Sequence, residues 1–225
     1  DHVDHLLGDI AAQHDDLHVR EQRQLRLEPG KAFLHAALFD GIGEEDLTRM
    51  LVCLGAKVEH FDKKYTIIKL LGKGKGGYSY LATDGEKQYV LKQIHHEPCA
   101  YYQFGNKMES ELNDYKRLTD IGIRMPKLLD YDMEQERILK EYIDGDTIFE
   151  LVCKDQMQDE YVEQMKGMCR RLHEANTNID YFPTNFVVQN GELFYIDFEC
   201  NNYMDEWNFE NWGIKYWSKT PEFLQ

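Results

Sequence analysis

The segment from Tyr65 to Ile94 has the pattern of a strand, a glycine-rich turn and two further strands. YTIIKLL precedes GKGKGGYS, YLAT follows the glycines, and KQYVLKQI follows a DG turn signal. Gly72, Gly74 and Gly77 give the spacing GxGxxG, in which missing side chains let backbone amides close over a triphosphate. The pattern therefore predicts a phosphate-binding loop between two consecutive strands.

The residues around this loop exclude two common kinds of nucleotide site. A Rossmann site requires a helix directly after the glycines, but YSYLAT reads as a strand. A Walker A loop requires Lys and then Ser or Thr after Gly77, and Tyr78 stands at the lysine position. The remaining type is the glycine-rich loop of protein kinases, which a strand follows.

The kinase type of loop also requires a lysine on the third strand and a carboxylate to hold it. Lys92 lies in VLK about twenty residues beyond Gly72, where a positive charge can hold the α- and β-phosphates. The helix expected over MESELNDYKRL offers Glu111 as the partner, with Glu109 as the alternative. Each residue alone would be an ordinary strand lysine or helical glutamate, and it is their order and spacing that favour the functional interpretation.

The segment NIDYFPTNFVVQNGELFYIDFECN carries the candidates for acceptor activation and metal binding. Asp180 and Asn185 have the spacing DxxxxN, a hairpin is expected at the NG turn, and Asp197 follows as DFE. In phosphoryl transfer one carboxylate orients or deprotonates the acceptor hydroxyl, while an amide oxygen and a second carboxylate hold magnesium. We assign these roles in order to Asp180, Asn185 and Asp197. The alternative is a structural hairpin flanked by turn-forming residues.

Together these motifs resemble the protein-kinase-like family over about 150 residues, from Tyr65 to Trp217. They are most similar to small bacterial kinases and to the aminoglycoside phosphotransferase, RIO and Bud32-like branches. The resemblance implies a two-lobed fold that binds ATP and Mg²⁺. It also implies a hinge at EYI, where the backbone of Glu141 and Ile143 would pair with the adenine edge.

The sequence departs from the family pattern at three positions. Asn178 stands where the family has the histidine of HxD, which predicts weaker packing behind the loop. Ser79 replaces the valine after the glycines, and Glu199 replaces the glycine of DFG. Glu199 argues against a DFG-type switch and is expected to help position a metal or a water.

The chain is also short after Asp197. Fewer than thirty residues follow it, with no APE sequence and no room for the long helical lobe of a eukaryotic protein kinase. The closing segment YMDEWNFENWGIKYW is rich in aromatic residues, and we expect it to seal a reduced lower lobe rather than to form a substrate lid.

Residues 1–62 are expected to form a polar and helical extension of unknown role. The first thirty are rich in His and Asp, and His14 and His18 have a spacing that would let them share a metal, although a solvated polar helix or tail is the simpler interpretation. The string from about residue 38 to 61 resembles the opening of the cyclic-nucleotide-binding domain of Crp/Fnr regulators. The rest of that domain has no counterpart here, which argues against a cyclic-nucleotide site.

The composition limits the partners. A formal net charge of −15 disfavours nucleic acid or an anionic membrane as the main partner, because phosphate binding needs clustered Lys and Arg. Five scattered cysteines without a CxxC pair indicate reduced thiols, and no apolar stretch is long enough for a membrane span. These features predict a cytoplasmic protein.

We therefore expect an α+β, two-lobed kinase-like fold, with an antiparallel sheet at 63–143 and a reduced helical part at 144–225. The predicted function is ATP- and Mg²⁺-dependent phosphoryl transfer to a protein Ser/Thr or a small-molecule hydroxyl. The alternatives are a nucleotide-binding pseudokinase that acts as an interaction module, and a regulatory fusion in which the N-terminal segment senses a ligand.

Overall fold

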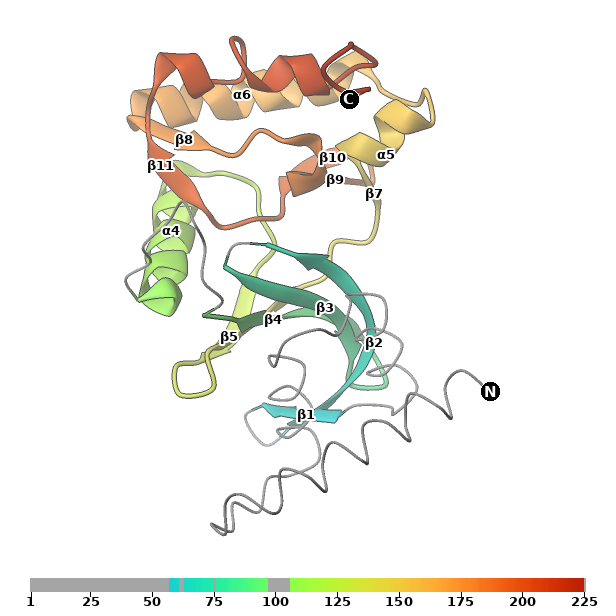
Figure 1. Ribbon diagram of the computed structural model, residues 1–225, viewed down its shortest axis with the longest axis vertical. Helices are drawn as coiled ribbons and strands as arrows, with labels where there is room; N and C mark the ends of the chain where they lie inside the picture. Colours follow the sequence, from blue (N-terminus) through green and yellow to red (C-terminus); the bar gives the residue numbers. More distant parts are fainter. Residues whose placement is uncertain (1–56, 61–62, 75, 97–105, 225) are drawn as a thin grey trace, which may run out of the picture. The chain divides into compact units, whose positions relative to one another are not determined.

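The computed structural model describes residues 57–60, 63–74, 76–96 and 106–224. The chain divides into two compact units, 1–47 and 48–225, and everything described lies in the second. The His14–His18 pair and most of the Crp/Fnr-like string therefore lie outside the described residues. The second unit has the expected α+β composition, with antiparallel sheets and a few helices (Figure 1).

The largest element is a six-stranded antiparallel sheet in the order β1-β2-β3-β4-β6-β5. Its strands are β1 (Lys57–His60), β2 (Lys63–Lys73), β3 (Gly77–Thr83), β4 (Gln88–Ile94), β5 (Leu128–Asp132) and β6 (Arg137–Glu141). The predicted hairpin between β3 and β4 is confirmed, with Gly85 at φ +99°. Its turn is fixed by Asp84, whose carboxylate accepts hydrogen bonds from the amides of Glu86 and Lys87 and from the hydroxyl of Tyr89.

Strand β1 falls within the segment expected to be a separate extension. It pairs with β2 from Lys57↔Thr66 to His60↔Lys63, so that the sheet begins before residue 63.

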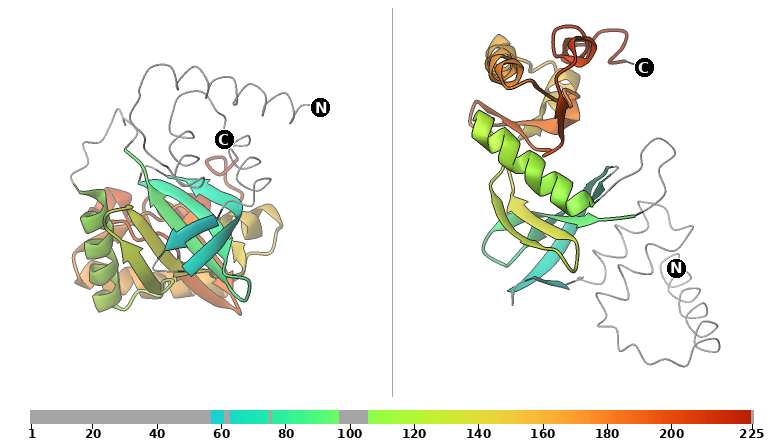
Figure 2. Two further views of the ribbon diagram at one scale, coloured as in Figure 1. Left: turned by 90° about the horizontal axis from the view of Figure 1, so that it is seen from below. Right: turned by 90° about the vertical axis from the view of Figure 1, so that its left-hand side faces the viewer.

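The helix expected around Glu111 is confirmed as α4 (Lys107–Ile121). Asn106 caps its first turn by accepting from the amide of Glu109, and Gly122 ends it in the left-handed conformation. Helix α4 lies beside the sheet (Figure 2). Its Met108 packs with Ile94 of β4 and Ile138 of β6.

The remaining residues form short helices and two small sheets. The helices are α5 (Ile148–Cys153) and α6 (Asp159–Glu174). A capping box at Thr147 and Glu150 starts α5. The small sheets contain β7 (Asp146–Thr147), β9 (Phe186–Gln189) and β10 (Glu192–Tyr195) in one, and β8 (Thr177–Ile179) and β11 (Cys200–Asn202) in the other. The 3-10 turns are η1 (Pro183–Asn185), η2 (Asp205–Trp207) and η3 (Gly213–Tyr216).

The main apolar core lies among α5, α6 and these small sheets. Phe209 and Trp217 of the aromatic closing segment are buried in it, and the indole of Trp217 donates to the carbonyl of Tyr181 at 2.9 Å. This confirms that the segment seals the core. Within the described ranges, none of the helices combines the length and apolar character that a membrane crossing needs.

Candidate functional site

Most of the residues singled out in the sequence line one cavity of about 900 Å³. Its walls come from the glycine-rich turn, β4, α4, the segment after β6, and the loops on either side of the β9–β10 hairpin. The predicted site residues in this lining are Gly72, Gly74, Gly77, Lys92, Glu111, Glu141, Ile143, Asn185 and Asp197. Asp180 is not among the lining residues, and neither is Glu109.

Lys92 and Glu111 form an ion pair in the cavity wall. The Lys92 Nζ lies 2.7 Å from Glu111 Oε2, and the two side chains are 12% and 9% exposed. Burial works against the charge of Lys92, but the carboxylates of Glu111, Asp197 and Glu199 outweigh it and raise the lysine pKa. The lysine is therefore held fully charged. The other oxygen of Glu111, Oε1, is buried and has no hydrogen-bond partner among the residues that the structure describes.

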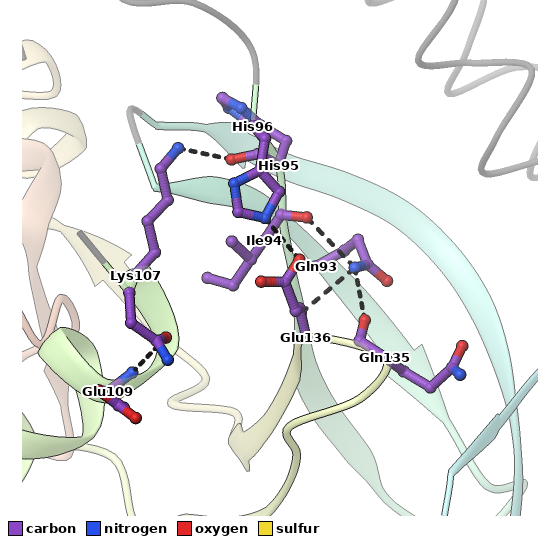
Figure 3. A network of polar contacts seen from close by, with 9 residues as sticks. Gln93, Ile94, His95, His96, Lys107, Glu109, Gln135 and Glu136 are labelled. Atoms are coloured by element: carbon purple, nitrogen blue, oxygen red, sulfur yellow. Dashed lines mark hydrogen bonds and ion pairs between the residues drawn. The ribbon is translucent and has the colours of Figure 1, made fainter. Parts of the chain in front are cut away.

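A second contact fixes β4 against α4 near this pair. The Nζ of Lys107, the first residue of α4, donates to the carbonyl of His95 at 2.5 Å (Figure 3). The side-chain amide of Gln93 donates to the carbonyl of Gln135, which ties the same end of β4 to the turn before β6. Helix α4 is thus joined to β4 by the Lys92–Glu111 ion pair, and to the residue just after β4 by the hydrogen bond from Lys107 to His95.

The glycine-rich turn closes through its own backbone and through His95. The amide of Gly74 donates to the carbonyl of Gly77 at 2.9 Å, and Nε2 of His95 lies 3.0 Å from the carbonyl of Gly74. Among the glycines of this turn, only Gly77 is required by packing, because a Cβ there would collide with the backbone of Gln93. A Cβ at Gly72 would meet nothing within 4 Å.

Gly76 is the glycine of the turn nearest to Lys92. A Cβ at Gly76 would lie 3.6 Å from the Nζ of Lys92, so a side chain there would enter the space in front of the ammonium. The GxGxxG spacing did not include this position, which borders the charged part of the cavity.

Asp197 lines the same cavity as Lys92. Burial by itself would raise the pKa of this carboxyl, but the ammonium groups of Lys92 and Lys140 and the amides of Phe198 and Glu199 hold it below its ordinary value. The amide of Phe198 donates to Asp197 Oδ1 at 2.8 Å. Asp197 is therefore ionised and faces the same space as Lys92.

Asn185 is held next to Asp197 by the backbone. The amide of Ile196 donates to the carbonyl of Asn185 at 2.9 Å, and Asn185 Nδ2 donates to the carbonyl of Asp180 at 3.4 Å. These contacts leave the Asn185 side-chain oxygen available. A carboxylate and an amide oxygen are hard donors of the type that Mg²⁺ takes from proteins together with phosphate oxygens, so the residues present fit this metal.

Asp180 is exposed, and its Oδ1 accepts from the amide of Phe182 at 3.0 Å. The expected weakness behind this loop at Asn178 is not found. Asn178 is 5% exposed, donates to the carbonyl of Met204 at 3.0 Å and accepts from the hydroxyl of Tyr181 at 3.2 Å. The amide at the histidine position therefore anchors the loop to the chain beyond β11.

The predicted hinge begins at Glu141, the last residue of β6. The amide of Glu141 donates to the carbonyl of Lys127 at 2.9 Å, and the amide of Lys127 donates back to the Glu141 carboxylate at 3.2 Å. Ile143 is buried and lines the cavity. Gly145 after it approaches β9 so closely that a Cβ would collide with the carbonyl of Val188.

Sequence reasoning missed three polar residues of this region, namely His95, Lys107 and Lys140. The first two lie on either side of a segment whose text gave no motif. Lys140 gave a usable signal, because it is a charged residue inside RILKEYI, an otherwise strand-like run that leads into the hinge.

Comparison with known proteins gives limited support to the kinase-like motifs. No family model matches the chain. Over 93 residues the chain is 26% identical to the KEOPS complex subunit Bud32 of Pyrococcus abyssi. The chain is thus similar to a kinase-like protein. The match covers 40% of this chain and 42% of the relative, so less than half of the relative's length is represented. The resemblance to Crp/Fnr regulators finds no support.

Proposed function

We propose that the protein is an ATP- and Mg²⁺-dependent phosphotransferase that transfers the γ-phosphoryl group to a protein Ser/Thr or small-molecule hydroxyl. The observation that carries the proposal is the Lys92–Glu111 ion pair at 2.7 Å in the wall of a cavity that Asp197 also lines. A buried pair of this kind costs desolvation energy that an apolar pair would not. A function for the charge explains why it is kept.

The nucleotide would be bound by groups from the whole lining. In this arrangement the glycine-rich turn covers the phosphates, Lys92 contacts the α- and β-phosphates, and the hinge backbone at Glu141 and Ile143 receives the adenine edge. The sheet part at 63–143 and the mainly helical part at 144–225 would then be the two lobes of a reduced kinase-like fold. The similarity to Bud32 supports this family assignment.

Asn185 and Asp197 would hold the magnesium ion. When bound, the metal would neutralise the negative charge of the phosphates. Asp180 would orient the acceptor hydroxyl and accept its proton as the acceptor oxygen bonds to the γ-phosphorus and the bond to the ADP oxygen breaks. The exposure of the Asp180 side chain to solvent supports this role.

The proposal is tested by incubating the protein with γ-labelled ATP and Mg²⁺, with and without cell extract, and separating proteins from small molecules. We expect label in the protein itself, in an extract protein or in a small molecule, and its loss in Lys92→Met. The matched control is Lys116→Met, which removes an exposed helical lysine paired with Asp120. Nucleotide binding without any transfer would instead identify a pseudokinase.

A further inference from the structure

Lys140 is a buried lysine in the cavity wall that the proposed reaction does not use. It lies in β6 one residue before the hinge, between β4 and β5, and is only 5% exposed. Burial and the nearby Lys92 lower its pKa to about 8. An apolar side chain of similar volume would fill this position at lower cost. The buried charge of Lys140 therefore indicates a specific role for this residue.

The contacts of Lys140 lie on both sides of Asp197. Its Nζ donates to the carbonyl of Ile196 at 2.8 Å and lies 4.4 Å from the ring centroid of Phe198. It forms no ion pair with any carboxylate in the described ranges, Asp197 included. The ammonium thus contacts both neighbours of Asp197. It forms a charge-assisted hydrogen bond with Ile196 and a cation–π contact with Phe198.

The segment around Asp197 depends on such contacts. Residues 196–199 lie between β10 and β11 and have no regular secondary structure. The amide of Ile196 is fixed by Asn185 and its carbonyl by Lys140, so both sides of this residue are tied. Phe198 is fully buried, with its ring also 4.6 Å from that of Tyr115.

We propose that Lys140 is a positioning residue that holds Asp197 toward the cavity by binding Ile196 and Phe198. The proposal rests on the proposed function for its consequence, which is that Lys140 sets how well Asp197 receives magnesium. It acts through Asp197 and is not assigned contact with the nucleotide.

Two variants and a control test the proposal in the full chain. Lys140→Met removes the hydrogen bond and the charge but keeps the length, Lys140→Arg keeps the charge and the donors, and Lys116→Met is the exposed control. The first readout is amide hydrogen exchange of residues 196–200 without nucleotide or metal. We expect exchange about tenfold faster or more in Lys140→Met, because a hydrogen bond from a charged donor is lost. The exchange rate in Lys140→Arg should lie nearer to the wild-type rate, and the rate in the control Lys116→Met should equal the wild-type rate.

The second readout is the Mg²⁺ concentration that gives half-maximal ATP binding, which we expect to rise about tenfold in Lys140→Met. A lower Mg²⁺ midpoint would overturn the proposal, since Lys140 would then only repel the metal. Unchanged exchange at 196–200 would overturn it too. A melting temperature of Lys140→Met well below that of wild type would also overturn the proposal, because Lys140 would then be a structural residue. If wild type shows no Mg²⁺-dependent ATP binding, the proposed function fails, and the exchange comparison alone decides the role of Lys140.

Discussion

Breaking the Lys92–Glu111 ion pair should destabilise the protein, whereas replacing both partners should not. Glu111→Met leaves the buried ammonium of Lys92 without its nearest counter-charge, and removing one partner of a buried pair costs about 3–5 kcal/mol. The side chains keep about a tenth of their exposure and Asp197 remains nearby, so we expect the lower end, about 3 kcal/mol. For a chain of this size, that lowers Tm by roughly 6–12 °C.

The double variant Lys92→Met/Glu111→Met should melt at or above the wild-type temperature. One oxygen of Glu111 has no hydrogen-bond partner in the described part of the chain, so the pair does not recover its full desolvation cost. The same variant should lose the stabilisation by ATP and Mg²⁺, which for wild type is about 2.7 kcal/mol at a hundredfold excess over Kd.

Urea unfolding of the wild type, both single variants and the double variant forms a double-mutant cycle that measures the coupling. The exposed pair Lys116 and Asp120, 2.6 Å apart, provides a matched cycle with an expected coupling below about 1 kcal/mol. If the losses at Lys92 and Glu111 simply add, the two residues are not a coupled buried pair, and the argument that function retains their charge is refuted.

Three further predictions concern single residues. Asp180→Asn should leave ATP affinity nearly unchanged but lower single-turnover transfer by about 10²- to 10⁴-fold; equal loss of both would contradict its assignment to the acceptor. Gly77→Ala should cost about 1–3 kcal/mol in urea unfolding, because its Cβ collides with the Gln93 backbone, while Gly72→Ala enters open space and should fold like wild type. The folded-state pKa of Asp84 is lowered to about 2, chiefly by hydrogen bonds from backbone amides, so its contribution to stability is present at neutral pH and lost as pH falls from about 4 to about 2. Asp84→Asn should therefore reduce the stability difference between pH 5 and pH 2 in urea unfolding, and an unchanged difference would show that the turn does not couple to acid unfolding.

The sequence predicted those elements of the fold that local chemistry determines. Glycine turns, the DG and NG hairpins and the amphipathic face of α4 can be recognised because each follows from backbone freedom or helical period. The buried carboxylates and Lys92 were found through their order and spacing along the chain.

The support around the site was not predictable in the same way. His95 binds the carbonyl of Gly74, and Lys107 binds the carbonyl of His95, so both contacts use backbone atoms that carry no sequence signature. The anchoring role of Asn178 depends on Met204, which is distant in sequence. Contacts of this type arise only when the chain is folded.

Calorimetric titration of the protein with ATP, in the presence and absence of Mg²⁺, measures whether the cavity binds ATP and whether the metal strengthens that binding. We predict that wild type binds ATP more tightly with Mg²⁺, that Asp197→Asn loses this metal-dependent part because a neutral amide cannot replace the carboxylate, and that the surface control Asp120→Asn behaves like wild type. No binding to wild type at millimolar ATP and Mg²⁺, or the same Mg²⁺ dependence in Asp197→Asn as in wild type, would contradict the account.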